Sequence, residues 1–254
     1  MSKKVFITFG AGGRNFYEAV FRICMQAKKT DLFDEIKGFT DNELRNDISF
    51  WNKHGDFIRK NRRGFGYWLW KPYLILQELN KMSYGDVLVY CDCGNEINYH
   101  ARDEFRKLLE SIPEKQLIAT NTGCSTRDWV KRDLLVLLDM DNDTVLSQTQ
   151  HQTGAIVFIK NDNIMNFVRE WYSICENYHN IDDSPSIIEN YQEFVEHRHD
   201  QSVFSLLTSK YNLRNIDFDP TYFCNWNDYN LIKNRPLVTT RNKTGRSFYK
   251  ELMI

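Results

Sequence analysis

The first forty residues alternate between short apolar runs and a helical pattern, and this order constrains the fold more than any other feature of the sequence. Val5–Phe9 is almost entirely apolar and ends at the glycine-rich stretch 10–13. Apolar residues then recur at helical spacing from Phe16 to Ala27, and Ile36–Phe39 is a second, mainly apolar run. A strand, a helix and a strand in this order predict a parallel pair of strands with the helix packed on it.

The same alternation continues along the chain and predicts one α/β domain, a mixed sheet flanked by helices. Further strands are expected at 87–90, 117–120 and 155–159, and further helices at 72–82, 105–112, 164–171 and 203–207. The polar stretch 139–153 is expected to be a loop, and 177–195 has no clear period. Asp200 is expected to be the N-cap of the helix that follows it.

The composition excludes several classes of protein. Hydrophobic residues make up 42% of the 254 residues and charged residues 26%, which excludes a disordered or collagen-like chain. The 33 Lys+Arg are balanced by 34 Asp+Glu, whereas a dedicated nucleic-acid binder carries an excess of cations. The six cysteines lack the paired spacing of a structural zinc site, so we expect free thiols. The N-terminal apolar run is too short for a signal peptide or a membrane span, and we expect a soluble, cytoplasmic protein.

The glycine-rich stretch does not complete a dinucleotide-binding fingerprint. That fingerprint needs glycine at its first, third and sixth positions, and the sixth position here is Asn15. We therefore expect a tight turn between strand and helix whose backbone approaches a nucleotide.

The segment 62–72, with the sequence RRGFGYWLWKP, combines three cations, four aromatic residues and two glycines. One interpretation is a packed aromatic turn with exposed basic residues. The other is a ligand wall, in which the rings stack on a ligand and Lys71, beside a helix N-terminus near Pro72, binds a phosphate.

Asp92 follows four apolar strand residues and lies where open α/β sheets bind their ligands. It could cap the next turn, or it could bind a hard divalent cation that keeps substrate phosphates in its shell. Three later segments also offer polar groups. They are Gln152-Thr153-Gly154 before a strand, His197–Gln201 before a helix, and Arg241, Lys243 and Arg246 near the C-terminus. A helix cap at Asp200 and a solvated C-terminal tail remain the alternatives to a functional role.

In this order the motifs resemble those of GT-A glycosyltransferases, especially the small nucleotide-sugar enzymes of the glycogenin and galactosyltransferase-like group (family 8 type). They are also similar to uncharacterised glycosyltransferase-like proteins of bacteria and large DNA viruses. Those proteins carry a GYWxWKP segment, a YxDxG strand end and an HRHDQS segment, which match 66–72, 90–94 and 197–202 here. The resemblance covers roughly residues 4–210. It implies a single GT-A-like, Rossmann-like domain with a nucleotide-binding half of about 1–98 and an acceptor and catalytic half of about 99–254.

The resemblance also implies roles for the matching residues. The residues expected at the nucleotide-sugar donor are Thr8, Phe9, Gly10, Lys71, Asp92, Gln152, Gly154, His199, Arg241 and Lys243. Asp92 matches the first acid of the family's metal-binding DxD motif, which implies a manganese or magnesium ion. Asp200 and Gln201 match the catalytic pair beside the sugar and its anomeric carbon.

Two departures from the family pattern bear on the mechanism. The second acid of the DxD motif is Gly94 here, and no histidine follows His199 to act as a late metal ligand. Arg241, Lys243 and Arg246 are then expected to neutralise the diphosphate in place of a metal.

The resemblance implies a hexosyltransferase that moves a sugar, from a UDP-sugar by preference, to a hydroxyl acceptor such as a glycan, with retention of configuration. Inversion with Asp200 as general base stays open. One alternative function is a non-catalytic nucleotide-sugar or glycan binding module on the same fold. Another is a Rossmann-type dehydrogenase or methyltransferase, which the incomplete glycine fingerprint disfavours. Residues 122–152 and 177–197 are expected to select the acceptor.

Overall fold

The structure is a computed structural model that describes residues 2–214, 221–223 and 229–254. The strands are β1 (Lys4–Gly10), β2 (Glu35–Thr40), β3 (Val87–Cys91), β4 (Glu96–Ile97), β5 (Leu117–Ser125), β6 (Thr149–Ile159), β7 (Thr221–Phe223) and β8 (Leu237–Thr239). The α-helices are α1 (Arg14–Thr30), α2 (Asp41–Asn46), α3 (Ile48–Lys60), α4 (Gly64–Tyr67), α5 (Trp70–Lys81), α6 (Arg102–Lys115), α7 (Thr126–Trp129), α8 (Arg132–Leu137), α9 (Asp143–Leu146), α10 (Asp162–Cys175), α11 (Asp200–Lys210) and α12 (Tyr229–Ile232). Short 3₁₀ helices lie at Tyr99–Ala101, Tyr178–Asn180 and Lys250–Leu252.

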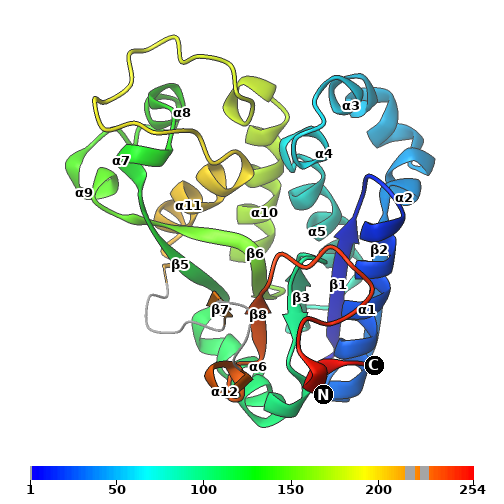
Figure 1. Ribbon diagram of the computed structural model, residues 1–254. Coiled ribbons are helices and arrows are strands. Elements are labelled where there is room, and N and C mark those ends of the chain that lie inside the picture. The colour runs from blue at the N-terminus through cyan, green and yellow to red at the C-terminus, as the bar shows by residue number, and fades with distance from the viewer. Residues whose placement is uncertain (1, 215–220, 224–228) are drawn as a thin grey trace.

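The main sheet has five strands in the order β2-β1-β3-β6-β5 (Figure 1). β1 pairs in parallel with β2 and β3, whereas β6 runs antiparallel to both β3 and β5. The expected α/β class, a mixed sheet flanked by helices, is therefore confirmed. A small second sheet, in the order β4-β8-β7, brings the C-terminal part of the chain beside the end of β3.

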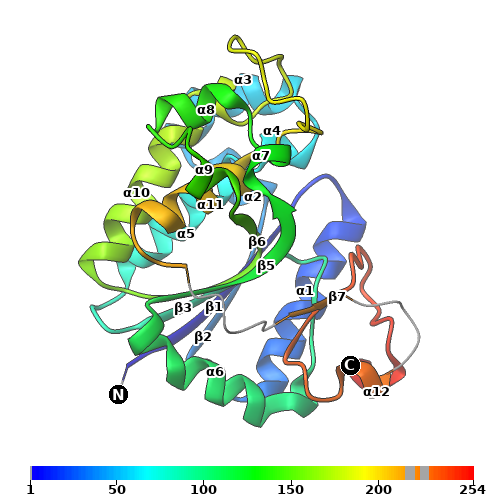
Figure 2. The same cartoon turned by 90° about the vertical axis from the view of Figure 1, so that its left-hand side faces the viewer.

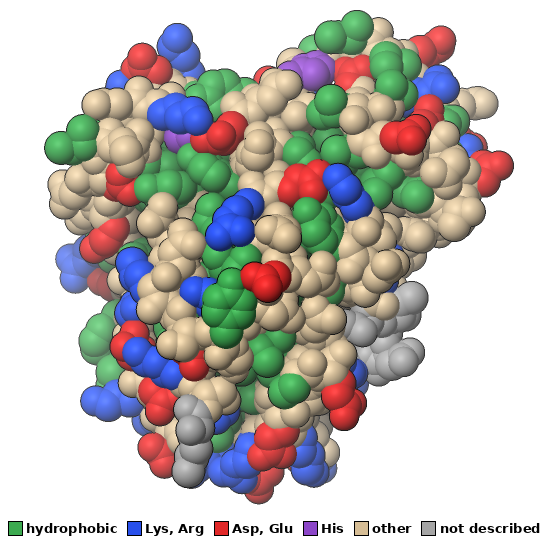
Figure 3. All heavy atoms as spheres, turned by 180° about the vertical axis from the view of Figure 1, so that it is seen from behind, with side chains coloured by type: hydrophobic (Ala, Val, Ile, Leu, Met, Phe, Trp, Pro, Cys, Tyr) green, Lys and Arg blue, Asp and Glu red, His purple; other side chains and the backbone are tan. Residues whose placement is uncertain are grey.

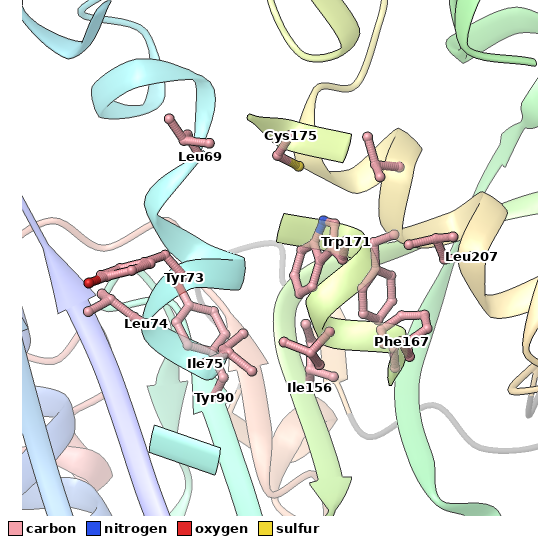
Figure 4. Close-up of a cluster of buried hydrophobic side chains, with 14 of the residues drawn as sticks. Leu69, Tyr73, Leu74, Ile75, Tyr90, Ile156, Phe167, Trp171, Cys175 and Leu207 are labelled. Carbon is pink, nitrogen blue, oxygen red and sulfur yellow. The ribbon is translucent and has the colours of Figure 1, made fainter. Parts of the chain in front are cut away.

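Helices cover both faces of the main sheet. α1 and α6 lie on one face, and α5, α10 and α11 lie on the other (Figure 2). The strands alternate accordingly: in β3, Val87 and Val89 pack toward α1 and α6, whereas Leu88 and Tyr90 pack into the larger core on the opposite face. In that larger core, side chains of α5 face side chains of α10, including Trp171 (Figure 4).

The expected loop at 139–153 is wrong in part, because β6 begins at Thr149 and continues to Ile159. Its first residues are polar but buried, and Gln150, His151 and Thr153 form hydrogen bonds to polar side chains of α11. A polar sequence therefore forms an interior strand here because a neighbouring helix supplies its hydrogen-bond partners. The sequence pattern also does not reveal α2 and α3.

Asp200 is not the N-cap of α11, contrary to expectation. His199 occupies the cap position with a φ of 54°, and Asp200 is the first helical residue. The Asp200 carboxylate instead accepts a hydrogen bond from Thr153 Oγ1 and lies near Lys71. The carboxylate is therefore directed toward Thr153 and Lys71 in the interior, although the Gln201 amide at its own helix end also favours its ionised form.

Two buried charged residues anchor the C-terminal segment. Arg22 of α1 is 1% exposed and donates hydrogen bonds to four backbone carbonyls, those of Cys93, Asn95, Asn242 and Thr244. Glu96 accepts hydrogen bonds from the Asn242 side chain, the Ser247 hydroxyl and the Phe248 amide. These bonds fix the segment 242–248 against α1 and the turn after β3.

The surface carries charges of both signs. In the view from behind, Lys and Arg side chains are interspersed with Asp and Glu (Figure 3). Within the described part of the chain, no helix is long and apolar enough to cross a membrane. The described cysteines are free thiols, and Cys224 lies outside the described residues.

Candidate active site

Asp92 lies directly after β3, at the edge where the parallel strands β1 and β3 both end. Its backbone amide donates a 2.8 Å hydrogen bond to the Gly154 carbonyl of β6, and the Tyr90 hydroxyl donates to its Oδ1. The side chain is 35% exposed. Asp92 is thus a carboxylate that is held by the sheet and still open to a ligand.

Lys71 lies in the first turn of α5 and is 2% exposed. Its Nζ is 3.3 Å from Asp92 Oδ1 and 3.7 Å from Asp200 Oδ2. It also donates to the Thr153 carbonyl at 3.1 Å and to Thr153 Oγ1 at 3.2 Å. A single buried ammonium group therefore lies between two carboxylates, where the low dielectric strengthens both attractions.

Asp200 is almost fully buried at the start of α11. Burial raises the pKa of its carboxyl to about 6, although the positive charge of Lys71 and the hydrogen bond from Thr153 both oppose this rise. Trp171 Nε1 donates a 3.0 Å hydrogen bond to the Asp200 backbone carbonyl and fixes the residue from behind. A carboxyl group with this pKa is poised to exchange a proton near neutral pH.

Gln152-Thr153-Gly154, which lie within β6 and not before it as the sequence predicts, face the same site. A Cβ atom at Gly154 would lie 3.3 Å from Asp92 Oδ2 and 3.6 Å from Gln152 Oε1. Glycine at this position therefore leaves room beside the Asp92 carboxylate. The structure thus brings Lys71, Asp92 and Asp200 together with this part of β6, as the sequence predicts for a shared site.

Gln201 lies apart from this cluster. Its Nε2 donates a 2.6 Å hydrogen bond to Gln150 Oε1 in β6. Gln150 in turn donates to the Trp129 carbonyl and the Ser202 hydroxyl, so the two amides form a buried network of their own.

The C-terminal basic residues divide into two groups. The backbone around Arg241 borders Gly94, since Asn242 N and Thr240 Oγ1 both donate to the Gly94 carbonyl, at 2.7 and 3.0 Å. Lys243 Nζ lies 5.4 Å from the centre of the Phe16 ring, near the glycine-rich turn. Arg246 instead lines a shallow pocket of about 490 Å³ on the outer side of α1. Arg241 and Lys243 therefore belong to segments that border the Asp92 turn.

The end of β1 offers mainly backbone to a ligand. Thr8 and Phe9 are buried, and the Phe9 ring stacks on Trp70 with centroids 3.9 Å apart. A Cβ at Gly10 would lie 2.8 Å from Val20 and 3.1 Å from Cys93 Sγ. Glycine thus allows the strand end, α1 and the turn after β3 to pack closely.

His199 borders the site from the side of α4. Its Nδ1 is 2.7 Å from the Ile181 carbonyl, and its ring lies beside those of Tyr67 and Trp68, with centroids 5.0 and 5.3 Å apart. The conformation of this aromatic segment is a feature that sequence reasoning missed.

The described residues supply few donor atoms for a divalent metal ion beside Asp92. Asp92 Oδ1 is already engaged by the Tyr90 hydroxyl and the Lys71 ammonium, and the place of a second acid is taken by Gly94. Within residues 2–214, 221–223 and 229–254, no three His, Cys, Asp or Glu side chains are grouped as metal ligands. Magnesium is commonly bound by one or two carboxylates together with substrate phosphates and waters, so a metal at Asp92 would take most of its ligands from the donor's diphosphate.

No known sequence family and no curated protein matches this chain. The solved structures similar in fold include the following two. Mouse xyloside xylosyltransferase 1, in its apo form, is 10% identical with a TM-score of 0.48, and the match covers 93% of this chain and 97% of that one. The galactosyltransferase LgtC, in complex with donor and acceptor sugar analogues, is 11% identical with a TM-score of 0.44, and the match covers 92% and 86%.

Proposed function

We propose that this protein is a glycosyltransferase, which moves a hexose from a nucleoside diphosphate sugar, with a UDP-sugar as the favoured donor, to a hydroxyl group of a glycan. The observation that carries the proposal is the buried ammonium of Lys71 between the carboxylates of Asp92 and Asp200, at the strand ends where open α/β sheets bind ligands. Carboxylates accept hydrogen bonds from sugar hydroxyls, and an ammonium attracts a phosphate. One small site therefore offers partners to both halves of such a donor.

In the proposed reaction, the bond between the anomeric carbon and the phosphate oxygen breaks, and its electron pair leaves on the diphosphate. The acceptor oxygen forms a new bond to that carbon, and its proton passes to the departing diphosphate oxygen, or to Asp200 in the inverting alternative. Positive charge develops on the sugar and negative charge on the leaving group. Asp200 would hold the sugar, while Lys71, Arg241 and Lys243 would stabilise the departing diphosphate. Retention is expected from the Asp200-Gln201 match, and the anomeric configuration of the product, read by NMR, distinguishes it from inversion with Asp200 as base.

The cationic side chains take the place of a metal ion in this proposal. Lys71 already lies against Asp92, and the Arg241–Lys243 segment borders Gly94. Transfer is then expected to proceed at an unchanged rate in the presence of EDTA. Stimulation of ten-fold or more by Mn²⁺ would contradict this part of the proposal.

The first experiment combines donor binding with transfer. A nucleoside diphosphate sugar at a hundred times its Kd is expected to stabilise the protein by about 2.7 kcal/mol in a thermal-shift assay. Asp92→Asn and Asp200→Asn are each expected to lower the transfer rate by roughly a hundred-fold or more. Asp86→Asn is the matched control, because Asp86 is a buried acid at the opposite end of β3 that accepts bonds from the Lys3 and Ser83 amides. Full transfer by both site variants would refute the assignment.

A second candidate function is a non-catalytic nucleotide-sugar or glycan binding module. It is favoured by Gln201, whose side chain bonds to Gln150 instead of facing the Lys71 cluster. A binding module would be stabilised by donor but would neither transfer nor hydrolyse it, whatever acceptor is supplied.

A further inference from the structure

Residues 64–68 form one turn of left-handed backbone. Their φ angles are 57° at Gly64, 54° at Phe65, 83° at Gly66, 52° at Tyr67 and 60° at Trp68. Only glycine adopts such angles without steric cost, yet three of these five residues carry large aromatic side chains. Backbone strain of this kind persists where surrounding contacts enforce it, and it is concentrated at functional sites.

Specific contacts hold this turn in place. Trp70 Nε1 donates a 2.9 Å hydrogen bond to the Gly64 carbonyl, and the Gly66 amide donates a 2.9 Å bond to the Asn61 carbonyl. A Cβ at Gly66 would lie only 2.7 Å from Ile58 Cγ1. The turn is therefore packed tightly against α3, and its left-handed course determines where Tyr67 and Trp68 lie.

The turn places an aromatic wall next to the reacting groups. The rings of Tyr67 and Trp68 both lie against His199, the residue before Asp200. The Trp68 carbonyl accepts a 2.9 Å hydrogen bond from the amide of Lys71, in the first turn of α5. Tyr67 and His199 are buried, whereas Trp68 is partly exposed. Gly64 and His199 cover part of the Trp68 ring, and its remaining, partly exposed surface lies within a few residues of both Lys71 and Asp200.

Charged side chains form a rim beside this wall. Arg63 bonds to Asp183 at 3.1 Å and to Glu196 at 3.4 Å, and each of the three side chains is more than 40% exposed. His199 Nε2, which is buried and has no hydrogen-bond partner, faces Asp183 Oδ1 at 3.8 Å. An imidazole nitrogen that receives no hydrogen bond is thus directed toward a carboxylate of the rim.

We propose that Trp68, with Arg63, Asp183 and Glu196, binds a sugar ring of the acceptor. An aromatic face packs against the apolar C–H face of a pyranose, while planar carboxylate and guanidinium groups bond to its hydroxyls. This inference rests on the proposed glycosyl transfer, for which it names a carbohydrate acceptor and a residue that selects it. Asp183 and Glu196 also lie in the segment 177–197, where the sequence predicts acceptor selection.

The test is saturation-transfer NMR on the full chain with methyl glycosides of glucose, galactose, mannose and N-acetylglucosamine at millimolar concentration. We expect at least one of them to bind, and its signal to fall at least five-fold in Trp68→Ala. Trp51→Ala is the matched control, because Trp51 is also partly exposed but already has Arg45 and Arg59 over its ring, at 4.8 and 5.5 Å. If Trp68→Ala does not fold, the double variant Asp183→Asn, Glu196→Gln replaces it, with the same expected loss.

The outcomes separate this inference from the proposed function. The acceptor subsite is overturned if the wild type gives no glycoside signal, or if the signal is unchanged both in Trp68→Ala and in the double variant of Asp183 and Glu196. If the protein binds UDP or GDP in either case, the donor site is still supported. Glycoside binding that depends on Trp68, without stabilisation by any nucleoside diphosphate sugar, overturns the transferase and supports the subsite. In a transfer assay, Trp68→Ala is expected to raise the acceptor KM at least ten-fold with the donor KM unchanged.

Discussion

At the scale of single residues, the candidate site depends on the balance of charge around Lys71. Two carboxylates and one ammonium leave a net negative charge, and Asp200 is the more deeply buried of the two acids. Lys71 is the strongest influence that favours the ionised form of Asp200, while burial and the charge of Asp92 oppose it. The protonation state of Asp200 therefore reports on the whole cluster.

This balance predicts a pH dependence of transfer. The pKa of Asp200 is raised to about 6, so the ionised carboxylate that the reaction requires is lost as the pH falls through that value. We expect kcat/KM, measured from pH 5 to 8, to rise with an apparent pKa near 6. Lys71→Met removes the positive charge that most favours the ionised carboxylate, so the pKa of Asp200 should rise further. The remaining activity of this variant should therefore increase at a higher pH than that of the wild type. A flat wild-type profile over this range would contradict the prediction.

Single residues of the site are predictable from the sequence, but their arrangement is not. Asp92 stands out because it ends a buried strand, and Lys71 because it precedes Pro72 in a basic, aromatic segment. The contact of Lys71 with both Asp92 and Asp200 joins segments up to 129 positions apart. No local period encodes such a contact, so the sequence predicts a phosphate ligand for Lys71 without revealing its carboxylate partners.

At the scale of elements, the left-handed turn 64–68 is the least predictable part of the site. Its aromatic residues indicate packing, but no residue type other than glycine indicates a positive φ. The polar start of β6 is a similar case, since its partners lie on α11 and the local pattern suggests a loop. Both elements depend on tertiary contacts rather than on local preference.

The packing of this turn is tested by a pair of glycine substitutions. Gly66 and Gly85 have similar φ angles, 83° and 88°, so alanine strains the backbone comparably at both. A Cβ at Gly66 would lie 2.7 Å from Ile58, whereas a Cβ at Gly85 would meet no atom within 4 Å. We expect Gly85→Ala to lower the free energy of unfolding by about 1 kcal/mol and Gly66→Ala by roughly 1–3 kcal/mol more. Equal losses in urea denaturation would show that the contact with Ile58 does not constrain the turn.

At the scale of the whole molecule, segments from both ends of the chain assemble the site. Arg22, near the N-terminus, bonds to the Asn242 carbonyl across 220 positions, and Asn242 in turn bonds to Gly94 beside Asp92. The parallel pairing of β1 and β2 could be anticipated from the alternation of strand and helix, but this closure could not, because its partners are mainly backbone carbonyls. Arg22 and Glu96 fix this segment beside the Asp92 turn, and Arg241 and Lys243 are positioned with it.

Buried histidines make the stability of the whole fold sensitive to acid. Burial lowers the pKa of His151 to about 4 and that of His197 to about 3, from an ordinary value of 6.5, and Arg214 near His151 and Lys131 near His197 act in the same direction. The unfolded chain therefore binds more protons than the folded one below pH 6.5, and the stabilisation by these neutral side chains is lost as the pH falls. Between pH 6.5 and 5 this costs about 2 kcal/mol for each histidine.

Asp200 has the opposite effect, because the folded protein holds its proton more tightly than the unfolded chain. Its raised pKa adds about 1 kcal/mol to the free energy of unfolding as the pH falls from 6 to 5. The net loss of roughly 3 kcal/mol should lower the Tm by roughly 5 to 10 °C between pH 6.5 and 5. In His151→Asn, an amide replaces the Nδ1 atom that bonds to Thr208 Oγ1, and the loss of stability over this pH range should fall by more than half, because one of the two histidines that cause it is gone. A Tm that stays constant or rises on acidification would mean that these histidines are not buried in their neutral form.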